Sequence, residues 1–584
     1  MLPVSPTITH NQPSTDKYIA LENENIPFKD SVYSAIGLSA AVVHQQLDFD
    51  NFLTTTLAHE AQKQAPGYNI LRRRIAILIG QWITVKVAPE NRGLVCHIFD
   101  HFLNPHDPLN DEVVRITAGR HLKNVADDWD FDAGHFMPYA ESIMTRLMKL
   151  IEEVESTETK MALLNTISVL VERLEHNVAP FANRIVELLP PLWEQSAEEH
   201  LMKQAILAIL ARLVNALKAQ SAPFHAMLIP IIQGAVEPDS ESQLYLLEDA
   251  LDLWHAILQQ AERPASAEIL SLITYLLPLF ELGSESLRKS LEITTSYVLL
   301  APEHVLSEPV RRQLLSSFSS LYATIKPEAS GMLNNIIEIM IQSAQSLGGD
   351  AAVHQMTSDL IETRLLPQQL EGLHSAWTAH CTTGPNAEAA AVDGVVETDY
   401  YSVLARLVLA SPSMFLSALG AASSSPPDAT LKWFLEEWFS HLDNIADPGR
   451  RKLMALAITK LLELNNAIVL QNLQLIMTMW TDVITELRID SNGEIVGLAA
   501  DSLVFESSEQ LRQVEQAVQE SPEDVRRRDL SFADPVHRIS LPEWVQGYLK
   551  MAIQNAGGEQ VFQSEWLVNV DREVIDAFGK LGIM

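Results

Sequence analysis

Apolar residues recur every three or four positions along most of this chain, which is the spacing of one face of an α-helix. The clearest example is the stretch 104–128. Pro105 and Pro108 end one helix, because proline lacks the amide hydrogen that a continuing helix needs. Asp107 and Asp111 can cap the next helix by accepting hydrogen bonds from its free amide groups. That helix places four apolar residues on one face: Val114, Ala118, Leu122 and Val125. The stretch therefore predicts two helices joined by a polar turn.

The same arrangement recurs downstream, with each apolar stripe preceded by a polar turn. Three of the stripes are Leu164-Ile167-Val171-Leu174, Met202-Ile206-Ile209-Leu213-Leu217 and Leu247-Leu251-Trp254-Leu258. Counted from Val113, equivalent positions fall near Lys160, His200, Gln243, Leu287 and Met332, in steps of about 40–47 residues, the period of HEAT and armadillo repeats. The alternating β-branched runs that indicate strands are nearly absent. Because one such helix pair cannot bury its own apolar faces, the pattern predicts an all-α HEAT/armadillo-type α-α superhelix (solenoid).

Arginines occupy positions where a helix alone would not favour them. Arg72, Arg73 and Arg74 crowd the first turns of a predicted helix over 68–85, although cations oppose the helix dipole there. We expect acidic partners in neighbouring repeats, and we favour this explanation over a binding role. Arg115 is likewise expected to reach an acidic residue of an adjacent unit.

Changes in composition divide the chain into six parts. We predict a disordered segment at 1–27, HEAT repeats at 28–380, a loop or insertion at 381–400, further HEAT-like helices at 401–506, a charged flexible segment at 507–540 and closing helices at 541–584. The loop is indicated by its small and polar residues, and the flexible segment by charges that are only partly periodic.

The charge balance narrows the class of partner. The chain has 584 residues, with 41 Lys and Arg against 75 Asp and Glu, a formal net charge of −34. A phosphate-binding surface needs cations, so direct nucleic-acid binding is not expected. An acidic surface attracts a basic protein, although solvation alone explains such charge equally well. Two cysteines exclude a disulfide framework, and no apolar run is long enough to predict a membrane span.

Two groups of acidic residues are the candidates for contact with a basic protein cargo. The first is Asp127, Asp128, Asp130 and Asp132, directly after a predicted second helix; the second is Glu248, Asp249 and Asp252, beside an apolar stripe. Such residues more often cap or solvate a turn than bind a ligand. The sequence is therefore compatible with a cargo contact and with a purely structural role for both groups.

Sequence patterns for catalysis and cofactors are absent. The chain contains no GxxxxGK[ST] or GxGxxG phosphate loop and no GxSxG nucleophile turn. His97 and His101 are four residues apart, but a third ligand for a metal is not placed near them. We therefore expect no catalytic residue, no metal and no cofactor, and the chain is not predicted to be an enzyme.

Several stretches in a fixed order carry a resemblance to a known family. They are residues 68–82 (YNILRRRIAILIGQW), 113–128, 189–196 (LPPLWEQS), 245–254 (YLLEDALDLW), and 526–528 (RRR) followed by 534–537 (DPVH). This set resembles the C-terminal half of the karyopherin-beta receptors, the importin-beta superfamily, from about Phe28 to the end of the chain.

The resemblance implies a nuclear transport receptor that shuttles between nucleus and cytoplasm and acts at nuclear pores. Such receptors bind cargo inside a HEAT superhelix, contact phenylalanine-glycine nucleoporins and release import cargo to Ran-GTP. Their main Ran contacts lie in N-terminal repeats, and we expect this chain to begin beyond them. The alternative is a static HEAT-repeat scaffold or a regulatory subunit of a protein assembly.

Overall fold

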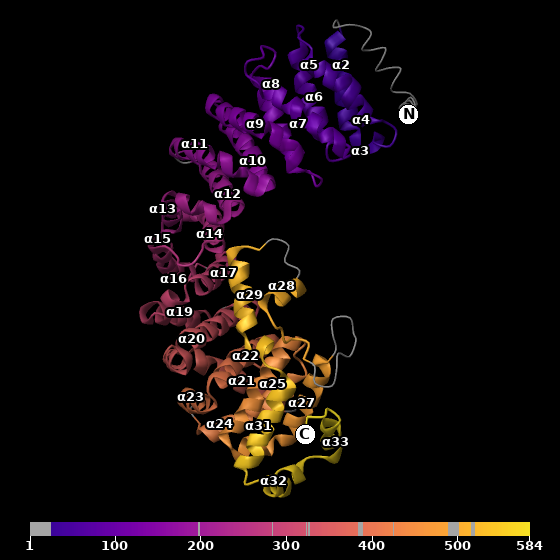
Figure 1. Cartoon of the computed structure of the whole chain (residues 1–584). Coiled ribbons are helices and arrows are strands. Elements are labelled where there is room, and N and C mark those ends of the chain that lie inside the picture. The colour runs from indigo at the N-terminus through magenta and orange to yellow at the C-terminus, as the bar shows by residue number, and fades with distance from the viewer. Residues whose placement is uncertain are drawn as a thin grey trace. The chain divides into compact units, whose positions relative to one another are not determined.

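The computed structural model describes residues 25–196, 199–282, 284–322, 324, 327–382, 389–423, 425–488, 501–515 and 520–583. Regular structure in these ranges is helical throughout, so the prediction of an all-α HEAT-type fold is confirmed. The chain divides into two units, Met1–Ile257 and Leu258–Met584. Each unit is a stack of paired helices (Figure 1).

Unit 1 is built from helices whose second members pack side by side. Its elements are α2 (Ile26–Leu38), α3 (Ala40–Val43), α4 (Phe49–Phe52), η2 (Leu53–Leu57), α5 (Ala58–Gln62), α6 (Tyr68–Trp82), α7 (Pro89–Leu103), α8 (Glu112–Ala126), α9 (Ala133–Glu153), α10 (Thr157–Leu174), η3 (Glu175–Phe181), α11 (Ala182–Gln195), α12 (His200–Leu217), η4 (Lys218–Phe224), α13 (His225–Val236) and most of α14 (Glu241–Gln260). Helices α2, α6, α8, α10 and α12 contact one another in that order. With α14, whose Tyr245 stacks on His200 of α12, they form what we call layer B of unit 1.

The repeat length of layer B agrees with the prediction. The helices α6, α8, α10, α12 and α14 begin at Tyr68, Glu112, Thr157, His200 and Glu241, so consecutive starts lie 41–45 residues apart. The stripe Leu164, Ile167, Val171 and Leu174 is buried, as is the stripe that begins at Met202. Gly119 of α8 allows the close approach of α10, because a Cβ at this position would lie 2.4 Å from a methyl carbon of Leu163.

Ion pairs join neighbouring repeats, as expected for the arginines near the helix starts. Arg72 is buried and lies 2.9 Å from Asp107, and Arg74 lies 2.7 Å from Asp30. Arg115 reaches Glu153 at 2.6 Å. Arg72, Arg74 and Arg115 therefore connect elements about one repeat apart, whereas Arg73 is exposed.

Unit 2 continues the same architecture. Its elements are α15 (Ala267–Ser271), η5 (Leu272–Tyr275), α16 (Leu276–Leu279), α17 (Ser284–Leu300), α18 (Pro302–Val305), α19 (Glu308–Tyr322), α20 (Pro327–Glu362), α21 (Leu365–Cys381), α22 (Gly394–Ala410), α23 (Pro412–Ala422), α24 (Pro427–Leu442), α25 (Pro448–Lys460), η6 (Leu461–Leu464), α26 (Ala467–Gln471), α27 (Leu473–Leu487), α28 (Ser508–Glu515), α29 (Pro522–Ala533), α30 (Pro535–Arg538), α31 (Leu541–Asn555), α32 (Glu559–Glu565), η7 (Leu567–Asn569) and α33 (Arg572–Gly579). Helices α17, α20, α22, α25 and α27 contact one another in that order and form layer B of unit 2. Gly349, with φ of 59°, breaks α20 into two straight parts.

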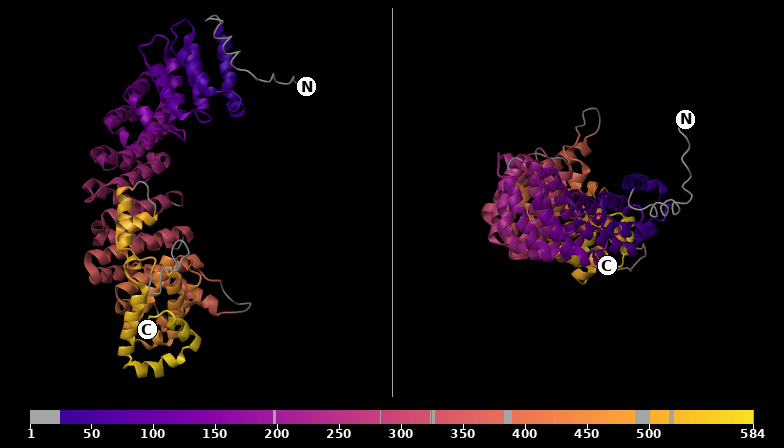
Figure 2. Two further views of the ribbon diagram at one scale, coloured as in Figure 1. Left: turned by 45° about the vertical axis from the view of Figure 1, so that its right-hand side comes forward. Right: turned by 90° about the horizontal axis from the view of Figure 1, so that it is seen from above.

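The C-terminal part of unit 2 returns along its own layer B. Helix α29 contacts α17, α30 contacts α25, and α31 and α33 contact α25 and α27 respectively. The left view of Figure 2 shows this yellow segment beside helices that are much earlier in the sequence. The chain therefore reverses direction after α27.

This return corrects the prediction for residues 507–540. The described residues of that range form α28, α29 and α30 rather than a flexible exposed segment. Ser521 and Asp524 form a capping box at the start of α29, and Asp534 caps α30. The prediction failed because the periodicity of this stretch is weak and its partners lie far away in the sequence.

Two other predicted boundaries shift. Asp393 caps α22 by accepting hydrogen bonds from the amides of Val395 and Val396, so residues 394–400 of the predicted 381–400 loop are helical. Three parts of the predicted segments lie outside the described residues: 383–388 of that loop, 489–500 of the predicted 401–506 part and 1–24 of the predicted N-terminal segment. Helix α2 begins at Ile26.

One stretch of the described residues, His200–Val236, is long and apolar enough by composition to cross a membrane. It folds as three successive elements, α12, η4 and α13, and half of its most apolar window is buried. Helix α12 packs on α10 within layer B. Burial among neighbouring repeats thus accounts for its apolar character.

Candidate functional site

The first acidic group lies in the turn between α8 and α9, and much of it supports that turn. Asp128 is buried and pairs with Arg92 of α7, and Asp130 lies 3.6 Å from the same arginine. Asp132 caps α9 by accepting a hydrogen bond from the amide of Gly134 at 2.8 Å. Asp127 is the C-terminal cap of α8 and is exposed. The structure thus gives Asp128 and Asp132 structural roles and leaves Asp127 and Asp130 facing solvent.

Between these aspartates lies Trp129, which the sequence analysis did not select. Its side chain is 91% exposed, the largest value among the exposed hydrophobic residues of the described chain. Tryptophan is enriched at energetically important positions of protein interfaces, and its ring face attracts cations. A tryptophan flanked by two solvent-facing carboxylates therefore has the chemistry to bind a lysine or arginine side chain.

The second acidic group lies on α14. Glu248 and Asp252 are exposed, and Asp249 is half-buried. Burial, followed by the charges of Asp252 and Glu248, raises the pKa of Asp249 above its usual value. A basic partner that approached this surface would relieve the repulsion among the three carboxylates.

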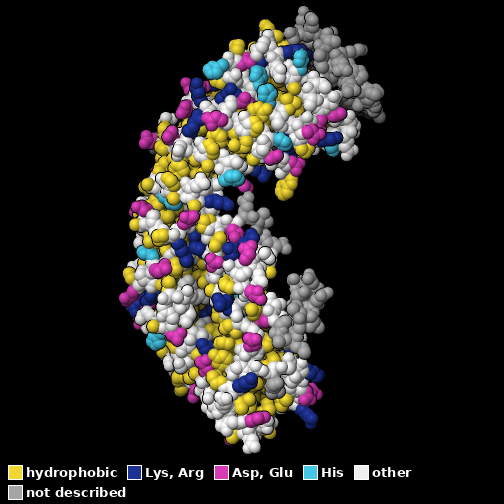
Figure 3. Space-filling model, viewed as in Figure 1, with side chains coloured by type: hydrophobic (Ala, Val, Ile, Leu, Met, Phe, Trp, Pro, Cys, Tyr) yellow, Lys and Arg dark blue, Asp and Glu magenta, His cyan; other side chains and the backbone are white. Residues whose placement is uncertain are grey.

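The two groups do not form a single site. Helices α8 and α14 are separated in layer B by α10 and α12, which at 8–10 Å for each helix spacing corresponds to roughly 30 Å. Figure 3 shows acidic and basic side chains interspersed over the visible surface. An extended ligand is needed to contact both groups.

Unit 2 has a different arrangement, because part of the chain covers its layer B. We call residues 520–540, which contain α29 and α30, the C-terminal strap. Its strongest anchor is Asp534, whose carboxylate receives two hydrogen-bonding contacts from Arg406 of α22, at 2.8 and 2.7 Å. Gln342 of α20 donates to the same carboxylate at 2.8 Å. This geometry fixes the junction between α29 and α30 on the layer.

Arg406 also pairs with a residue of the layer itself. Its Nε donates to Glu338 of α20 at 3.2 Å. Burial raises the pKa of Glu338, against the opposing effect of Arg406. Burial alone would lower the pKa of Arg406, but Asp534 and Glu338 more than offset it and raise that pKa. The guanidinium therefore bridges a carboxylate of the layer and a carboxylate of the strap.

Lys452 of α25 makes a second bridge of this kind. Its ammonium lies 2.7 Å from Asp501 and also donates to the main-chain carbonyl of Val536 in the strap. Burial lowers the pKa of Lys452, although Asp501 acts in the opposite direction. Both bridges combine a buried cation of layer B with one acceptor inside the strap and one outside it.

Arg526 anchors the other end of the strap. Its guanidinium donates to the main-chain carbonyls of Ala261 at 2.6 Å and Leu258 at 3.0 Å. Burial lowers the pKa of Arg526 to about 10. Arg527 and Arg528 instead pair within the strap, with Glu523 and Glu520. Only the first residue of the arginine triplet therefore contacts residues outside the strap, and these lie at the C-terminal end of α14 and directly after it.

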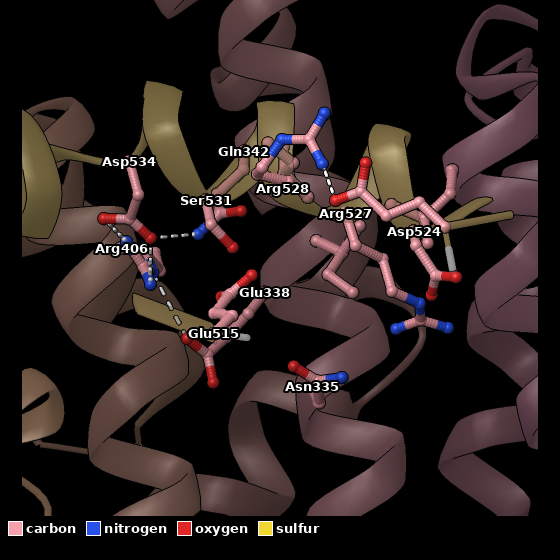
Figure 4. A pocket seen from close by; sticks show the side chains of 14 residues that line it. Asn335, Glu338, Gln342, Arg406, Glu515, Asp524, Arg527, Arg528, Ser531 and Asp534 are labelled. Carbon is pink, nitrogen blue, oxygen red and sulfur yellow. Dashed lines mark hydrogen bonds and ion pairs between the residues drawn. The ribbon is translucent and has the colours of Figure 1, made fainter. Parts of the chain in front are cut away.

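A polar cleft of about 470 Å³ remains between the strap and layer B. Figure 4 shows the side chains that line it, among them Asn335, Glu338, Gln342, Arg406, Asp524 and Ser531. The lining mixes carboxylates, guanidinium groups and amides, without a nucleophile beside a base. The arrangement is suited to binding charged groups.

The sequence contained a signal for the strap that the analysis missed. Ser521-Pro522-Glu523-Asp524 has the N-cap, first-turn proline and acidic residue of a helix start, and Asp534-Pro535 repeats that cap-and-proline pattern. The helices were thus recognisable, but their binding surface was not.

Comparison with known proteins places these features in a family. A sequence model described as "Importin-11-like, TPR repeats" matches residues 204–583. Human importin-11 is 30% identical over 554 residues, which cover 94% of this chain and 53% of the human protein. The importin beta-like protein kap113 of Schizosaccharomyces pombe is 26% identical, over 87% of this chain and 48% of its own length. The chain thus spans about half the length of the curated relatives that it matches.

A solved structure supports the fold. Lph2, described as a bidirectional nuclear transport receptor of Saccharomyces cerevisiae, is similar with a TM-score of 0.81 and 23% identity, over 98% of this chain and 59% of that chain. The karyopherin resemblance of the sequence is confirmed by these matches. The 41–45-residue spacing of layer B is longer than the 34 residues of a TPR repeat and agrees with HEAT repeats.

Proposed function

The chain belongs to the importin-11-like family, and on that premise we propose that it acts in nuclear transport as a receptor for protein cargo. The single observation that carries the proposal is the similarity to human importin-11 over 94% of the chain. The receptor works by reversible binding, not by catalysis. Its fold supports this role because stacked helix pairs offer long surfaces to extended ligands.

The proposed cargo is a basic protein segment. The net charge of −34 favours approach of a basic ligand. In unit 1 the acidic turn around Trp129 and the carboxylates of α14 offer contacts about three helix spacings apart. Asp127, Trp129 and Asp130 form the primary contact, and Glu248, Asp249 and Asp252 form a second one.

A peptide-binding measurement tests the cargo proposal. The probe is a fluorescent synthetic peptide of about twenty residues, rich in lysine and arginine, whose binding is followed by polarisation over a salt series. The triple variant Asp127→Asn, Trp129→Ala, Asp130→Asn should bind about tenfold more weakly, since three contacts worth about 0.5 kcal/mol each sum to about 1.5 kcal/mol. Glu152→Gln, at an exposed site on α9, is the matched control. Equal affinities for all three proteins would refute the assignment.

The transport role itself requires a cellular assay. We propose that the receptor moves between nucleus and cytoplasm, binds phenylalanine-glycine nucleoporins at the pore and releases cargo to Ran-GTP. In permeabilised cells, a fluorescent fusion of the full chain should enter nuclei with a basic reporter and bind phenylalanine-glycine repeats weakly in pull-downs. Release of the reporter by Ran held in its GTP form tests the regulation separately. A complex that binds no pore repeats and is unaffected by Ran would favour the static scaffold.

A further inference from the structure

The strap is attached to layer B of unit 2 mainly by charges. Within residues 520–540, all of which the structure describes, Val536 is the one buried aliphatic side chain, whereas Val525, Leu530 and Phe532 are only half-buried. The following helix α31 differs, because Leu541 and Val545 are fully buried. A segment that buries little apolar surface gains little from the hydrophobic effect, so its attachment depends on its few polar anchors.

Removing the strap would leave neither Arg406 nor Lys452, the two bridging cations of the layer, without a partner. Arg406 would retain Glu338 at 3.2 Å, and Lys452 would retain Asp501 at 2.7 Å. A buried charge that loses its only partner is strongly destabilising, and this obstacle to dissociation is absent here. Arg526 would return to water, where a guanidinium is well solvated.

The strap also packs incompletely against the layer. The cleft of about 470 Å³ lies directly between α29 and helices α20 and α22 (Figure 4). Permanent interfaces between core helices are packed as densely as organic crystals and leave few voids larger than a water molecule. The contact between the strap and layer B therefore leaves more open space than a densely packed core interface does.

We propose that the face of layer B in unit 2 beneath the strap is a docking surface for a charged helix of another protein, with the strap as its exchangeable internal ligand. The anchors define the chemistry of the partner. It carries an arginine that caps the carbonyls of Leu258 and Ala261, and, about eight residues later, an aspartate that binds Arg406. A helical partner with this order of charges reproduces the contacts that Arg526 and Asp534 of the strap make.

The covalent connection of the strap determines how easily another helix can replace it. A tethered ligand has an effective concentration in the millimolar range, so a partner helix competes poorly with the strap at ordinary concentrations. The intact chain should therefore bind such a helix weakly, and a chain without the strap should bind it strongly. This proposal concerns a different face from the acidic groups of unit 1 and does not rest on the transport function.

The main experiment uses a variant of the full chain in which residues 520–540 are replaced by a Gly-Ser linker of equal length. The probe is a fluorescent synthetic peptide of residues 520–540. Saturable binding to the linker variant, at least tenfold tighter than to the intact chain, is the expected result. A peptide with Arg526→Ala and Asp534→Asn should bind at least tenfold more weakly, whereas the matched peptide with Asp529→Asn, at an exposed position, should be unchanged. Absent or equal binding by a linker variant with a native circular-dichroism spectrum would overturn the proposal.

A second measurement applies if the linker variant does not fold. Trypsin cleaves after Arg526, Arg527 and Arg528 only when the strap leaves the layer. In the intact chain the cleavage rate should rise several-fold as salt is raised from low to molar concentration, since ionic anchors are screened. Asp534→Asn should accelerate cleavage at low salt, and Asp529→Asn should not. A rate that neither salt nor Asp534→Asn changes would show a permanent contact and overturn the proposal.

Discussion

Units 1 and 2 use the same paired helices and ion pairs between neighbouring repeats, but unit 2 adds contacts of much longer range to its layer B. In unit 1 the buried ion pairs join neighbouring repeats, as Arg72 does with Asp107. In unit 2 Asp534 reaches Arg406, 128 residues earlier, and Arg526 reaches Leu258, 268 residues earlier. A repeat array can therefore be stabilised by ion pairs between one repeat and the next, and also by a returning segment that contacts several repeats.

The difference has a consequence for function. A buried ion pair between neighbouring repeats cannot be removed without loosening the stack, because no other segment supplies the missing charge. A returning segment covers a surface that the stack has already formed, so its loss exposes that surface and leaves the stack in place. On the two proposals made above, unit 1 offers fixed recognition groups, and unit 2 offers a surface that the strap covers or exposes.

The largest expected effect is in unit 1. Arg72→Ala leaves Asp107 without its guanidinium partner and removes hydrogen bonds to Asn110 and to the carbonyl of Ala61. We expect a loss of about 4 kcal/mol in the free energy of unfolding, as for other broken buried pairs. Urea denaturation monitored by circular dichroism measures it. Arg73→Ala, at the adjacent exposed position, should change stability by less than about 0.5 kcal/mol. Similar losses of stability in both variants would mean that the buried Arg72–Asp107 pair has no special role in stabilising the stack.

The second effect tests a buried pair of like charges in unit 2. Glu397 of α22 and Glu437 of α24 are both buried. Burial, and then the charge of Glu437, raises the pKa of Glu397 to about 7, from an ordinary value of 4.5. Between these values the folded chain holds a proton that the unfolded chain releases. Stability should therefore be highest at the acidic end of this window and fall by roughly 3 kcal/mol as pH rises through it.

Thermal unfolding from pH 5 to pH 7.5 measures this dependence. Glu397→Gln should flatten the slope, because the amide cannot ionise, and Glu573→Gln, at an exposed position of α33, should retain it. A slope that survives in Glu397→Gln would assign the proton to another group.

The third effect is smaller and local to the strap. Asp534→Asn removes the charge that binds Arg406 and leaves Arg406 paired with Glu338. Because a charged hydrogen bond is lost but no cation is stranded, we expect about 2 kcal/mol less protection of the strap. Hydrogen exchange of the α29 amides should accelerate accordingly, while amides in the middle of α22 keep their rates. Equal acceleration in both helices would make the strap part of the core.

The smallest effect is expected at an exposed ion pair of unit 1. Arg184 pairs with Glu141 at 3.0 Å, but both side chains are exposed. Arg184→Ala should lower the free energy of unfolding by less than about 0.5 kcal/mol. Comparison with Arg72→Ala in the same urea titration shows how much burial increases the contribution of such an ion pair to the free energy of unfolding. A loss near that of Arg72→Ala would contradict the role of burial.

The prediction of the candidate site from sequence was only partly possible. The residues Asp127, Asp128, Asp130 and Asp132 look equivalent in the sequence, yet Arg92 neutralises Asp128 and the amide of Gly134 engages Asp132. Trp129 resembles the other tryptophans until its exposure of 91% is known. Whether a side chain faces solvent depends on the turn that holds it, and that turn is set by partners in α7 and α9.

What the sequence determined by itself was the repeat: helical periodicity in stripes such as Leu164-Ile167-Val171-Leu174, polar turns at a constant spacing, and a strong excess of acidic residues. These features are local, so a window of one repeat contains the information. The tertiary structure alone decided that residues 520–540 lie on layer B, that Arg406 bridges Glu338 and Asp534, and that a cleft remains beneath them. The contact between Arg406 and Asp534 joins residues 128 positions apart, and no local pattern specifies which charged groups meet when the chain turns back on a surface it has already built.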